Sequence, residues 1–306
     1  MSNGFISESV TLVPERTQRD WIMVRAKRIL GKLVPEQLRI AVICTREFWK
    51  AFHRPLNLVV PKTFNEKIQW RKVWDRDPRL PLRSDKILVK DFVRAKLGDD
   101  WLIPTIWSGK ELPPREERNW PIPFVIKINS GSGWNIFVRS EAERDWSKIE
   151  RLCANWMNQR FGHHLGEWLY SRIEPRILVE PFISHERMLP WDYKLWVFRG
   201  RVEFIHVDTD RENAPKRAFF DRDWRPVPFA IDLDGHPREP RVIPRPTSLE
   251  KMIAAAETLA EDFRFVRVDL YEVDGQPRFG EMTFYPRSGF GQFAPPEFDR
   301  IVGSLW

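Results

Sequence analysis

Apolar residues recur at helical spacing in the first third of the chain. Residues 17–52 predict two helices, Asp20–Leu30 and Arg39–Phe52, with Gly31 ending the first and Pro35 opening the second. Basic residues lie between the apolar positions, which is typical of a helix that packs on the protein body or lies on a membrane surface. We expect packing on the body.

Two further helices are predicted before residue 100. Phe64–Trp74 follows Thr63, and Glu66 stands three residues after that threonine, which is the spacing of a capping box. Ser84–Leu97 begins in a similar way, with Ser84 as the expected N-cap.

The periodicity changes after residues 112–123, which are rich in Pro, Glu and Arg and are expected to form a linker. Helices are expected over residues 141–170 and 248–261, and residues 208–245 are expected to form a long loop with a short hairpin. Runs of alternating or continuous apolar residues predict seven strands: Phe124–Ile128, Trp134–Arg139, Ile177–Ile183, Tyr193–Phe198, Arg201–Val207, Phe265–Tyr271 and Arg278–Phe284.

Composition restricts the class of protein. With 306 residues, 42% of them hydrophobic, the chain is long enough for about two globular domains. No apolar run is long enough to span a bilayer, and the first ten residues lack the pattern of a secretory signal. Cys44 and Cys153 are far apart, which excludes a cysteine-built zinc site and indicates the reducing cytoplasm.

The chain has a net charge of +7. Such a charge suits nucleic acid, but it equally suits nucleotides and acidic small molecules. Because the basic residues are interleaved with acidic ones and form no dense run, we do not expect a nucleic-acid partner.

A glycine-rich loop separates the first two predicted strands. It contains Ser130, Gly131, Ser132 and Gly133, whose backbone amides and hydroxyls can surround phosphate oxygens. The loop is neither a P-loop nor a dinucleotide-binding turn, since a strand follows it, and by itself it is equally consistent with a hairpin turn. Lys127, a cation in an otherwise apolar strand, adds weight to the phosphate interpretation.

The last predicted hairpin carries a second group of polar residues. Arg267 and Asp269 share one strand face, and Glu281 and Thr283 share a face of the partner strand. Two carboxylates on adjacent strands suit Mg²⁺ with phosphates as the other ligands, whereas the alternative is an exposed face with an Arg–carboxylate pair. Asp192 and Lys194 similarly share a face, as a phosphate contact or as a salt-bridged strand edge.

The order of these parts resembles the ATP-grasp superfamily, and within it the TupA-like branch associated with teichuronopeptide and surface-polysaccharide synthesis. The resemblance covers roughly residues 55–306. The matching segments are Pro61–Trp70, Ser84–Lys86, Phe124–Asn135, Ile177–Phe182, Asp192–Phe198 and Arg267–Gly289.

The resemblance implies an α+β fold in which two lobes with antiparallel sheets clasp ATP. The expected parts are a helical N-terminal extension (1–54), an N-terminal lobe (55–115), a small lobe with the glycine loop and hinge (116–185) and a C-terminal lobe with the metal site (186–306).

The resemblance also implies roles for individual residues. Lys127 and Lys86 would bind phosphates, Ser130–Gly133 would close over the γ-phosphate, and Asp192 would belong to the nucleotide site. Glu180, by its main-chain carbonyl or its side chain, would form the adenine hinge with the backbone that includes Phe182 and Ile183.

At the metal end, Asp269 and Glu281 would hold Mg²⁺. Thr283 stands where many ATP-grasp enzymes have Asn, so it either serves as a weaker ligand or leaves the ion less firmly held. Arg267 and Lys194 would neutralise charge on the transferring phosphoryl group.

The reaction implied is an ATP-dependent ligation of a carboxylate to an amine through an acylphosphate. The resemblance suggests a uronic acid or sugar nucleotide as the acid and an amino acid or other small amine as the acceptor. Candidates for binding the substrate are Arg287, Ser288, Gly289, Lys216 and Arg217. A sugar kinase, a non-catalytic nucleotide-binding scaffold and, more weakly, a glycosyltransferase stay open as alternatives. Oligomeric state and membrane contact of residues 17–52 stay open as well.

Overall fold

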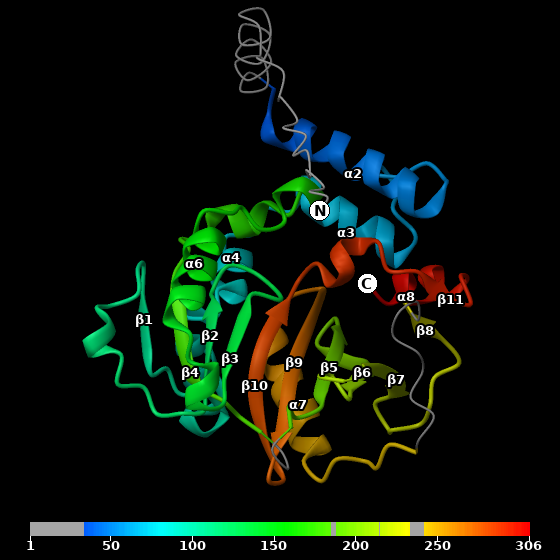
Figure 1. Ribbon diagram of the computed structural model, residues 1–306. Coiled ribbons are helices and arrows are strands. Elements are labelled where there is room, and N and C mark those ends of the chain that lie inside the picture. Colours follow the sequence, from blue (N-terminus) through cyan, green and yellow to red (C-terminus); the bar gives the residue numbers. More distant parts are fainter. Residues whose placement is uncertain (1–33, 185–187, 214, 233–241) are drawn as a thin grey trace, which may run out of the picture.

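The computed structural model describes residues 34–184, 188–213, 215–232 and 242–306 (Figure 1). The predicted helix Asp20–Leu30 lies outside these residues. Some helices gather at one end of the molecule, two antiparallel sheets stand side by side below them, and other helices lie along the sheets.

From residue 34 onward, four α-helices precede the first strand: α2 (Glu36–Phe52), α3 (Phe64–Trp74), α4 (Arg79–Ser84) and α5 (Leu88–Leu97). The capping box of α3 is confirmed, because the Thr63 side chain accepts from the amide of Glu66 and the Glu66 carboxylate accepts from the amide of Thr63. The predicted helix Ser84–Leu97 is confirmed at its end, Leu97, but its predicted start at Ser84 is wrong. Ser84 ends α4, and the Asp85 carboxylate accepts from the amides of Ile87 and Leu88 instead, so a second helix starts there.

The small sheet has the strand order β1-β4-β2-β3. Its strands are β1 (Trp107–Gly109), β2 (Phe124–Ile128), β3 (Asn135–Val138) and β4 (Ile177–Pro181). Helix α6 (Trp146–Met157) covers one face, and its Ile149 and Cys153 join the apolar cluster beneath the sheet. The observed helix is shorter than the one predicted over 141–170, because α6 ends at Met157; a separate 3₁₀ segment follows, flanked by Gly162 and Gly166, both with positive φ.

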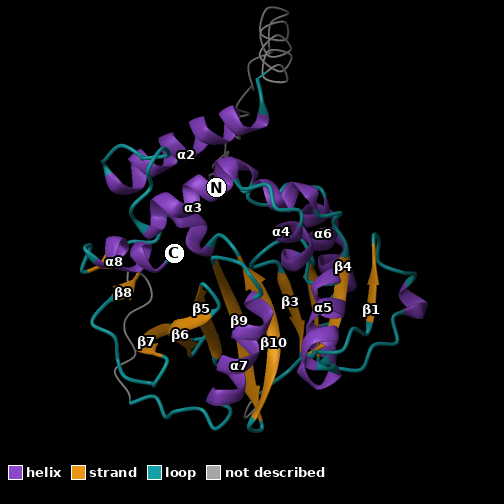
Figure 2. Ribbon diagram, turned by 180° about the vertical axis from the view of Figure 1, so that it is seen from behind, coloured by secondary structure: helices purple, strands orange, loops and turns teal. Residues whose placement is uncertain are grey.

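The large sheet has the strand order β10-β9-β5-β6-β7. Its strands are β5 (Asp192–Phe198), β6 (Arg201–Thr209), β7 (Lys216–Asp221), β9 (Phe265–Val273) and β10 (Gln276–Thr283). Helix α7 (Leu249–Ala260) packs on one face, as Figure 2 shows from behind. The expected loop over 208–245 is wrong at β7, which pairs with β6 from Phe204 to Thr209.

Two separate clusters of buried apolar side chains underlie the two sheets. The larger one joins the large sheet to α3, α4 and α5, with Phe64 of α3 in contact with the rings of Trp196, Phe198 and Phe265. Helices α3 to α5 thus share the core of the large sheet, whereas α6 belongs to the small one.

Helix α3 also has a buried polar side that holds the segment after β10. That segment is the short 3₁₀ turn Pro286–Gly289. Gln69 donates to the carbonyls of Ser288 and Gly289, and the fully buried Lys72 donates to the carbonyl and the hydroxyl of Ser288. A buried cation needs such partners, so α3 fixes this turn against the sheet. Two short strands, β8 (Ala230–Ile231) and β11 (Phe293–Ala294), and the helix α8 (Phe298–Leu305) complete the described fold.

Candidate active site

A cavity of about 330 Å³ lies between the two sheets. Among its described lining residues, six are cations and four are carboxylates, so the cavity carries an excess of positive charge. The cations are Lys86, Lys90, Lys127, Lys194, Arg211 and Arg267, and the carboxylates are Glu180, Asp192, Asp269 and Glu281. Such an excess favours an anionic ligand.

The wall on the side of the small sheet consists of Lys90, Lys127 and Glu180, and we call it the lysine wall. Nζ of Lys127 lies 2.6 Å from Oε2 of Glu180, while Lys90 binds the other carboxylate oxygen. Burial would raise the pKa of Glu180, but the two lysines lower it overall. Both carboxylate oxygens of Glu180 are therefore engaged by lysines.

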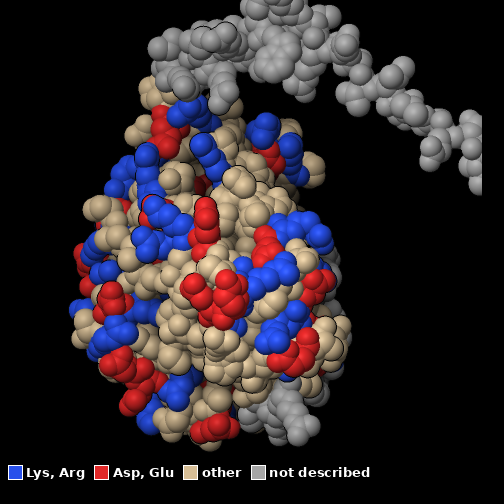
Figure 3. Space-filling view, turned by 60° about the vertical axis from the view of Figure 1, so that its left-hand side comes forward, with Lys and Arg blue, Asp and Glu red and all other residues tan. Residues whose placement is uncertain are grey.

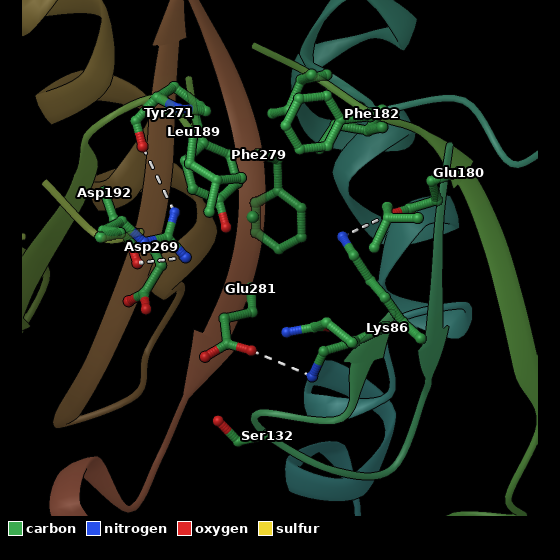
Figure 4. Close-up of a pocket in the computed structure, with 18 of the residues that line it drawn as sticks. Lys86, Ser132, Glu180, Phe182, Leu189, Asp192, Asp269, Tyr271, Phe279 and Glu281 are labelled. Carbon is green, nitrogen blue, oxygen red and sulfur yellow. Dashed lines mark hydrogen bonds and ion pairs between the residues drawn. The ribbon is translucent and has the colours of Figure 1, made fainter. Parts of the chain in front are cut away.

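The glycine loop closes one end of this cavity, where Ser132 and Gly133 line it. Lys86 precedes α5 and donates to the carbonyl of Gly131 over 2.6 Å. Its Nζ also lies 3.2 Å from Oε2 of Glu281 on the opposite sheet. Figure 4 shows Lys86 and Glu281 facing each other across the cavity, so one lysine connects the helical segment, the glycine loop and the large sheet.

The wall on the side of the large sheet consists of Asp192, Lys194, Arg267, Asp269 and Glu281, and we call it the carboxylate wall. Its positions lie side by side because Lys194 pairs with Asp269 in register, and Asp269 with Glu281. These residues come from β5, β9 and β10, and all five face the cavity. The strand alternation predicted from the sequence therefore brings the expected residues together.

Arg267 occupies the centre of the carboxylate wall. It binds both oxygens of Asp269, at 2.7 and 2.6 Å, and donates to Oγ1 of Thr283 over 3.1 Å. Thr283 in turn donates to Oε1 of Glu281 over 3.1 Å. Burial raises the pKa of Asp269, and Arg267 opposes that rise. Burial would also raise the pKa of Glu281, but Lys86 and Arg267 lower it to about 2.

Lys194 extends the carboxylate wall toward β6. It pairs with Asp192 and, over 2.9 Å, with Asp208. Burial would lower the pKa of Lys194, yet the surrounding carboxylates raise it. Nε2 of His206 lies 2.8 Å from Oδ1 of Asp208, and burial lowers the pKa of this histidine.

A second cavity of about 420 Å³ adjoins the first. Ser132, Lys194, Arg267 and Glu281 line both, so the two cavities meet at the glycine loop and the carboxylate wall. The second cavity extends to other polar groups: His206, Asp208, Arg217, Asp232, Thr283, Arg287 and Ser288.

The candidate substrate residues differ in their surroundings. Arg287 lies beside the second cavity, has a φ of 49° and pairs with Asp232. Arg217 is buried and pairs with Asp208 while donating to the carbonyl of Asp232 over 2.6 Å. Gly289 packs against α3, where a Cβ would lie 2.5 Å from the side chains of Ile68 and Gln69. Lys216 is absent from the described lining of both cavities.

The predicted hinge lies where β4 ends. Phe182 and Ile183 both line the first cavity, and the amide of Phe182 donates to the carbonyl of Pro123 over 3.0 Å. That bond leaves the Phe182 amide unavailable to adenine. Ser130 is buried behind the loop and is absent from the described lining of either cavity.

The donor set restricts which metal could bind. In the described chain, no group of three His, Cys, Asp or Glu side chains is arranged to hold a metal ion. Asp269 and Glu281 supply two carboxylates opposite each other in register, with the hydroxyl of Thr283 beside them. This set fits Mg²⁺ that takes its remaining oxygens from phosphates and water, and not a cation held by the protein alone.

Several lining residues were not anticipated. Lys90 stands four residues after Lys86, and Tyr271 continues the alternation of Arg267 and Asp269, so both had a local signal. His206 and Asp208 had no local sequence signal beyond strand alternation, because their position near the site depends on the pairing of β5 with β6. Arg211 lies in a loop without a periodic pattern.

Two antiparallel sheets that clasp a cavity between a lysine wall and a carboxylate wall define the ATP-grasp class of protein. The chain belongs to the TupA-like ATP-grasp family, whose model matches residues 66–306. None of the curated proteins matches the chain.

Among solved structures, three ligases are similar to the chain at low identity. D-alanine–D-alanine ligase from Bacillus anthracis in complex with ATP is 16% identical, with 66% of this chain and 54% of that chain covered and a TM-score of 0.36. The ADP complex of purK, N5-carboxyaminoimidazole ribonucleotide synthetase, is 16% identical, with 69% and 50% covered and a TM-score of 0.39. L-amino acid ligase from Bacillus licheniformis is 15% identical, with 82% and 49% covered and a TM-score of 0.38. The chain thus spans about half the length of these proteins.

The outer surface and the lengths of the helices concern the expectations about surface charge and membrane spanning. On the face shown in Figure 3, Lys and Arg side chains lie beside Asp and Glu side chains across the described surface. Within the described part of the chain, every helix is too short or too polar to cross a bilayer.

Proposed function

We propose that the chain is an ADP-forming carboxylate–amine ligase that uses ATP and Mg²⁺. The observation that carries the proposal is the meeting of two cavities at Ser132, Lys194, Arg267 and Glu281. A nucleotide in the first cavity would place its γ-phosphate at this junction, and an acid in the second would reach it from the other side. Membership of the TupA-like ATP-grasp family supports the same assignment.

In this proposal the lysine wall and Lys86 bind the phosphates, and the backbone at Glu180 and Ile183 contacts adenine. Asp269 and Glu281 hold Mg²⁺, which supplies neutralisation of phosphate charge, and Thr283 orients Glu281 through its hydroxyl. Arg267 and Lys194 stabilise the transferring phosphoryl group, because both are buried cations at the junction.

The chemistry follows in two steps. A substrate carboxylate oxygen attacks the γ-phosphorus, which forms an acylphosphate and releases ADP. An amine nitrogen then attacks the acyl carbon, phosphate leaves, and the amine loses one proton as the amide forms. The protein acts mainly by positioning the two reactants and neutralising charge.

For the substrates, we propose a uronic acid within a sugar or sugar nucleotide, joined to an amino acid or small amine during polysaccharide synthesis. Arg287 and Ser288 are the proposed contacts to the acid, since both line the second cavity. An arginine can bind a carboxylate through two parallel hydrogen bonds. Arg287 would give up its ion pair with Asp232 and bind the carboxylate of the substrate instead. The supply of ATP implies a cytoplasmic reaction.

The test is turnover of Mg·ATP with uronic acids and their nucleotide sugars against pooled amino acids. ADP and free phosphate are followed in parallel, and products are identified by mass. Equal ADP and phosphate, with a product equal to acid plus amine minus water, is the expected result. ADP without phosphate and a phosphorylated product would instead identify a sugar kinase. Absence of ATP binding would contradict the nucleotide site itself.

A further inference from the structure

Helix α2 carries a line of exposed apolar side chains that nothing in the described fold covers. Leu38, Val42 and Trp49 are spaced by four and seven residues, so they lie on one side of the helix. They are 52%, 69% and 55% exposed, respectively. We call these three residues the apolar stripe.

The other side of α2 is fully used. Ile40, Cys44 and Phe48 are buried where α2 packs against α3 and the 3₁₀ turn His163–Leu165. Figure 1 shows α2 at the end of the molecule, beyond α3 and away from both sheets. The stripe therefore contributes neither to the core nor to the cavities.

A basic line runs beside the stripe. Arg39, Arg46 and Lys50 are exposed and are spaced by seven and four residues, so they also lie on one side of the helix. Arg39 and Lys50 each directly follow a residue of the stripe in the sequence. Arg46 and Lys50 share a single carboxylate, that of Glu47, so these two cations keep a positive excess.

Nearly all of the net charge of the chain lies in this region. Residues 1–65 contain 11 basic and 5 acidic residues, a net charge of +6, and they precede the family match at residue 66. Residues 66–306 contain 39 basic and 38 acidic residues, a net charge of +1. The catalytic body is thus close to neutral, and the segment that includes α2 is strongly basic.

This combination selects among the partners that could cover the stripe. A second copy of the chain would bring the basic lines of two α2 helices together, and like charges would repel each other. A partner that covers both the stripe and the basic line must offer an apolar interior and an anionic surface. The tryptophan on the stripe suits such a partner, because tryptophan is enriched at the boundary between lipid headgroups and acyl chains.

We propose that α2 is an interfacial helix that holds the protein on an anionic lipid bilayer. The apolar stripe enters the headgroup region, and Arg39, Arg46 and Lys50 lie against the acidic headgroups. This proposal is independent of the proposed ligase activity, since it concerns a surface outside both cavities.

The test is co-sedimentation of the full chain with vesicles of phosphatidylglycerol and phosphatidylcholine in equal parts, compared with phosphatidylcholine alone. We expect binding to the anionic vesicles that is at least tenfold stronger and that high salt releases. In a stripe variant, Leu38→Ser/Val42→Ser/Trp49→Ser, this binding should fall at least tenfold. The matched control is Leu82→Ser/Leu88→Ser/Ile301→Ser, which removes three comparably exposed apolar side chains elsewhere and should bind as the wild type does.

Three outcomes would overturn the proposal. The first is equal or absent binding to the two kinds of vesicle, and the second is undiminished binding by the stripe variant. The third is a wild-type dimer, seen by sedimentation velocity without lipid, that the stripe variant dissociates. Thermal unfolding of each variant shows that it is folded, so lost binding reports the surface and not the fold.

Discussion

The lysine wall and the carboxylate wall face the same cavity but are built differently. In the lysine wall, two lysines share the single carboxylate of Glu180, which leaves one positive charge in excess. In the carboxylate wall, charges of both signs come from β5, β9 and β10, and Lys194 and Arg267 each contact two carboxylates. The lysines of the lysine wall could exchange their one carboxylate partner for phosphates. The more numerous ion pairs of the carboxylate wall hold its side chains in fixed positions, which would suit stabilisation of the charge on a transferring phosphoryl group.

This difference teaches which wall governs which kinetic parameter. If the lysine wall binds and the carboxylate wall performs chemistry, variants of the first should act on the KM for ATP and variants of the second on kcat. Four substitutions sharpen or break this division.

The largest effect is expected for Glu281→Gln. Removing this charge takes away half of the proposed Mg²⁺ site at the junction, so kcat should fall about 10³-fold. Steady-state formation of ADP measures the change. The matched control is Glu203→Gln on β6, whose carboxylate pairs with Arg201 outside both cavities and whose loss should leave kcat unchanged. A kcat for Glu281→Gln within twofold of the wild type would contradict the metal assignment.

Lys127→Met should lower kcat/KM for ATP about 10²-fold, mainly through a higher KM, because a charge-assisted contact to phosphate is lost. Nucleotide titrations alongside kinetics separate the two parameters. Lys110→Met is the control, since Lys110 pairs with Glu174 on the exposed surface near the small sheet. If kcat falls and the KM does not change, the division between the two walls is wrong.

Thr283→Val should lower kcat about tenfold. The valine keeps the shape of threonine but loses the hydroxyl that connects Arg267 to Glu281. Thr283→Ser retains that hydroxyl and should recover most of the activity. The Mg²⁺ dependence of turnover distinguishes orientation from direct ligation, because loss of a ligand would raise the Mg²⁺ concentration required.

The smallest effect is expected for Lys86→Met, which should change how the free energy of unfolding depends on pH. Lys86 helps to lower the pKa of Glu281 from its ordinary 4.5 to about 2 in the folded protein. A lowered folded-state pKa means that the stabilisation is complete above about pH 4.5 and is lost as the pH falls toward 2. The difference in unfolding free energy between wild type and variant, about 1 kcal/mol by urea titration at neutral pH, should therefore shrink over that range. A difference in unfolding free energy that does not change with pH would contradict an effect of Lys86 on the pKa of Glu281.

Local patterns predicted the parts of the fold that depend on neighbouring residues. The capping box of Thr63 and Glu66 predicted α3, and alternation through Arg267, Asp269 and Glu281 predicted the hairpin of β9 and β10 with its polar face. Strand β7 was missed because it is stabilised by pairing with β6 and lies between loops rich in Pro, Asp and Arg.

The same reasoning applies to the site. Lys127 stood out locally as a cation in an otherwise apolar strand, whereas Lys86 was expected only from the family resemblance; both line the first cavity. The contact of Lys90 with Glu180 spans 90 residues along the chain, and no local pattern reports it. The second cavity was likewise invisible, since it depends on how Pro286–Gly289 is held by Gln69 and Lys72 of α3.

The bridge made by Lys86 has a consequence for affinity. Its ammonium group already has two partners, the carbonyl of Gly131 and the carboxylate of Glu281. Under the proposed function, entry of a polyphosphate would be an ion exchange, in which the nucleotide would replace an internal anion at Lys86. An exchange of this kind releases little net electrostatic energy, so discrimination between nucleotides would depend on the fit of the base and on how far the two sheets approach. Under the proposed function, Glu281 would compete with the phosphates for Lys86 until the ligand displaces it.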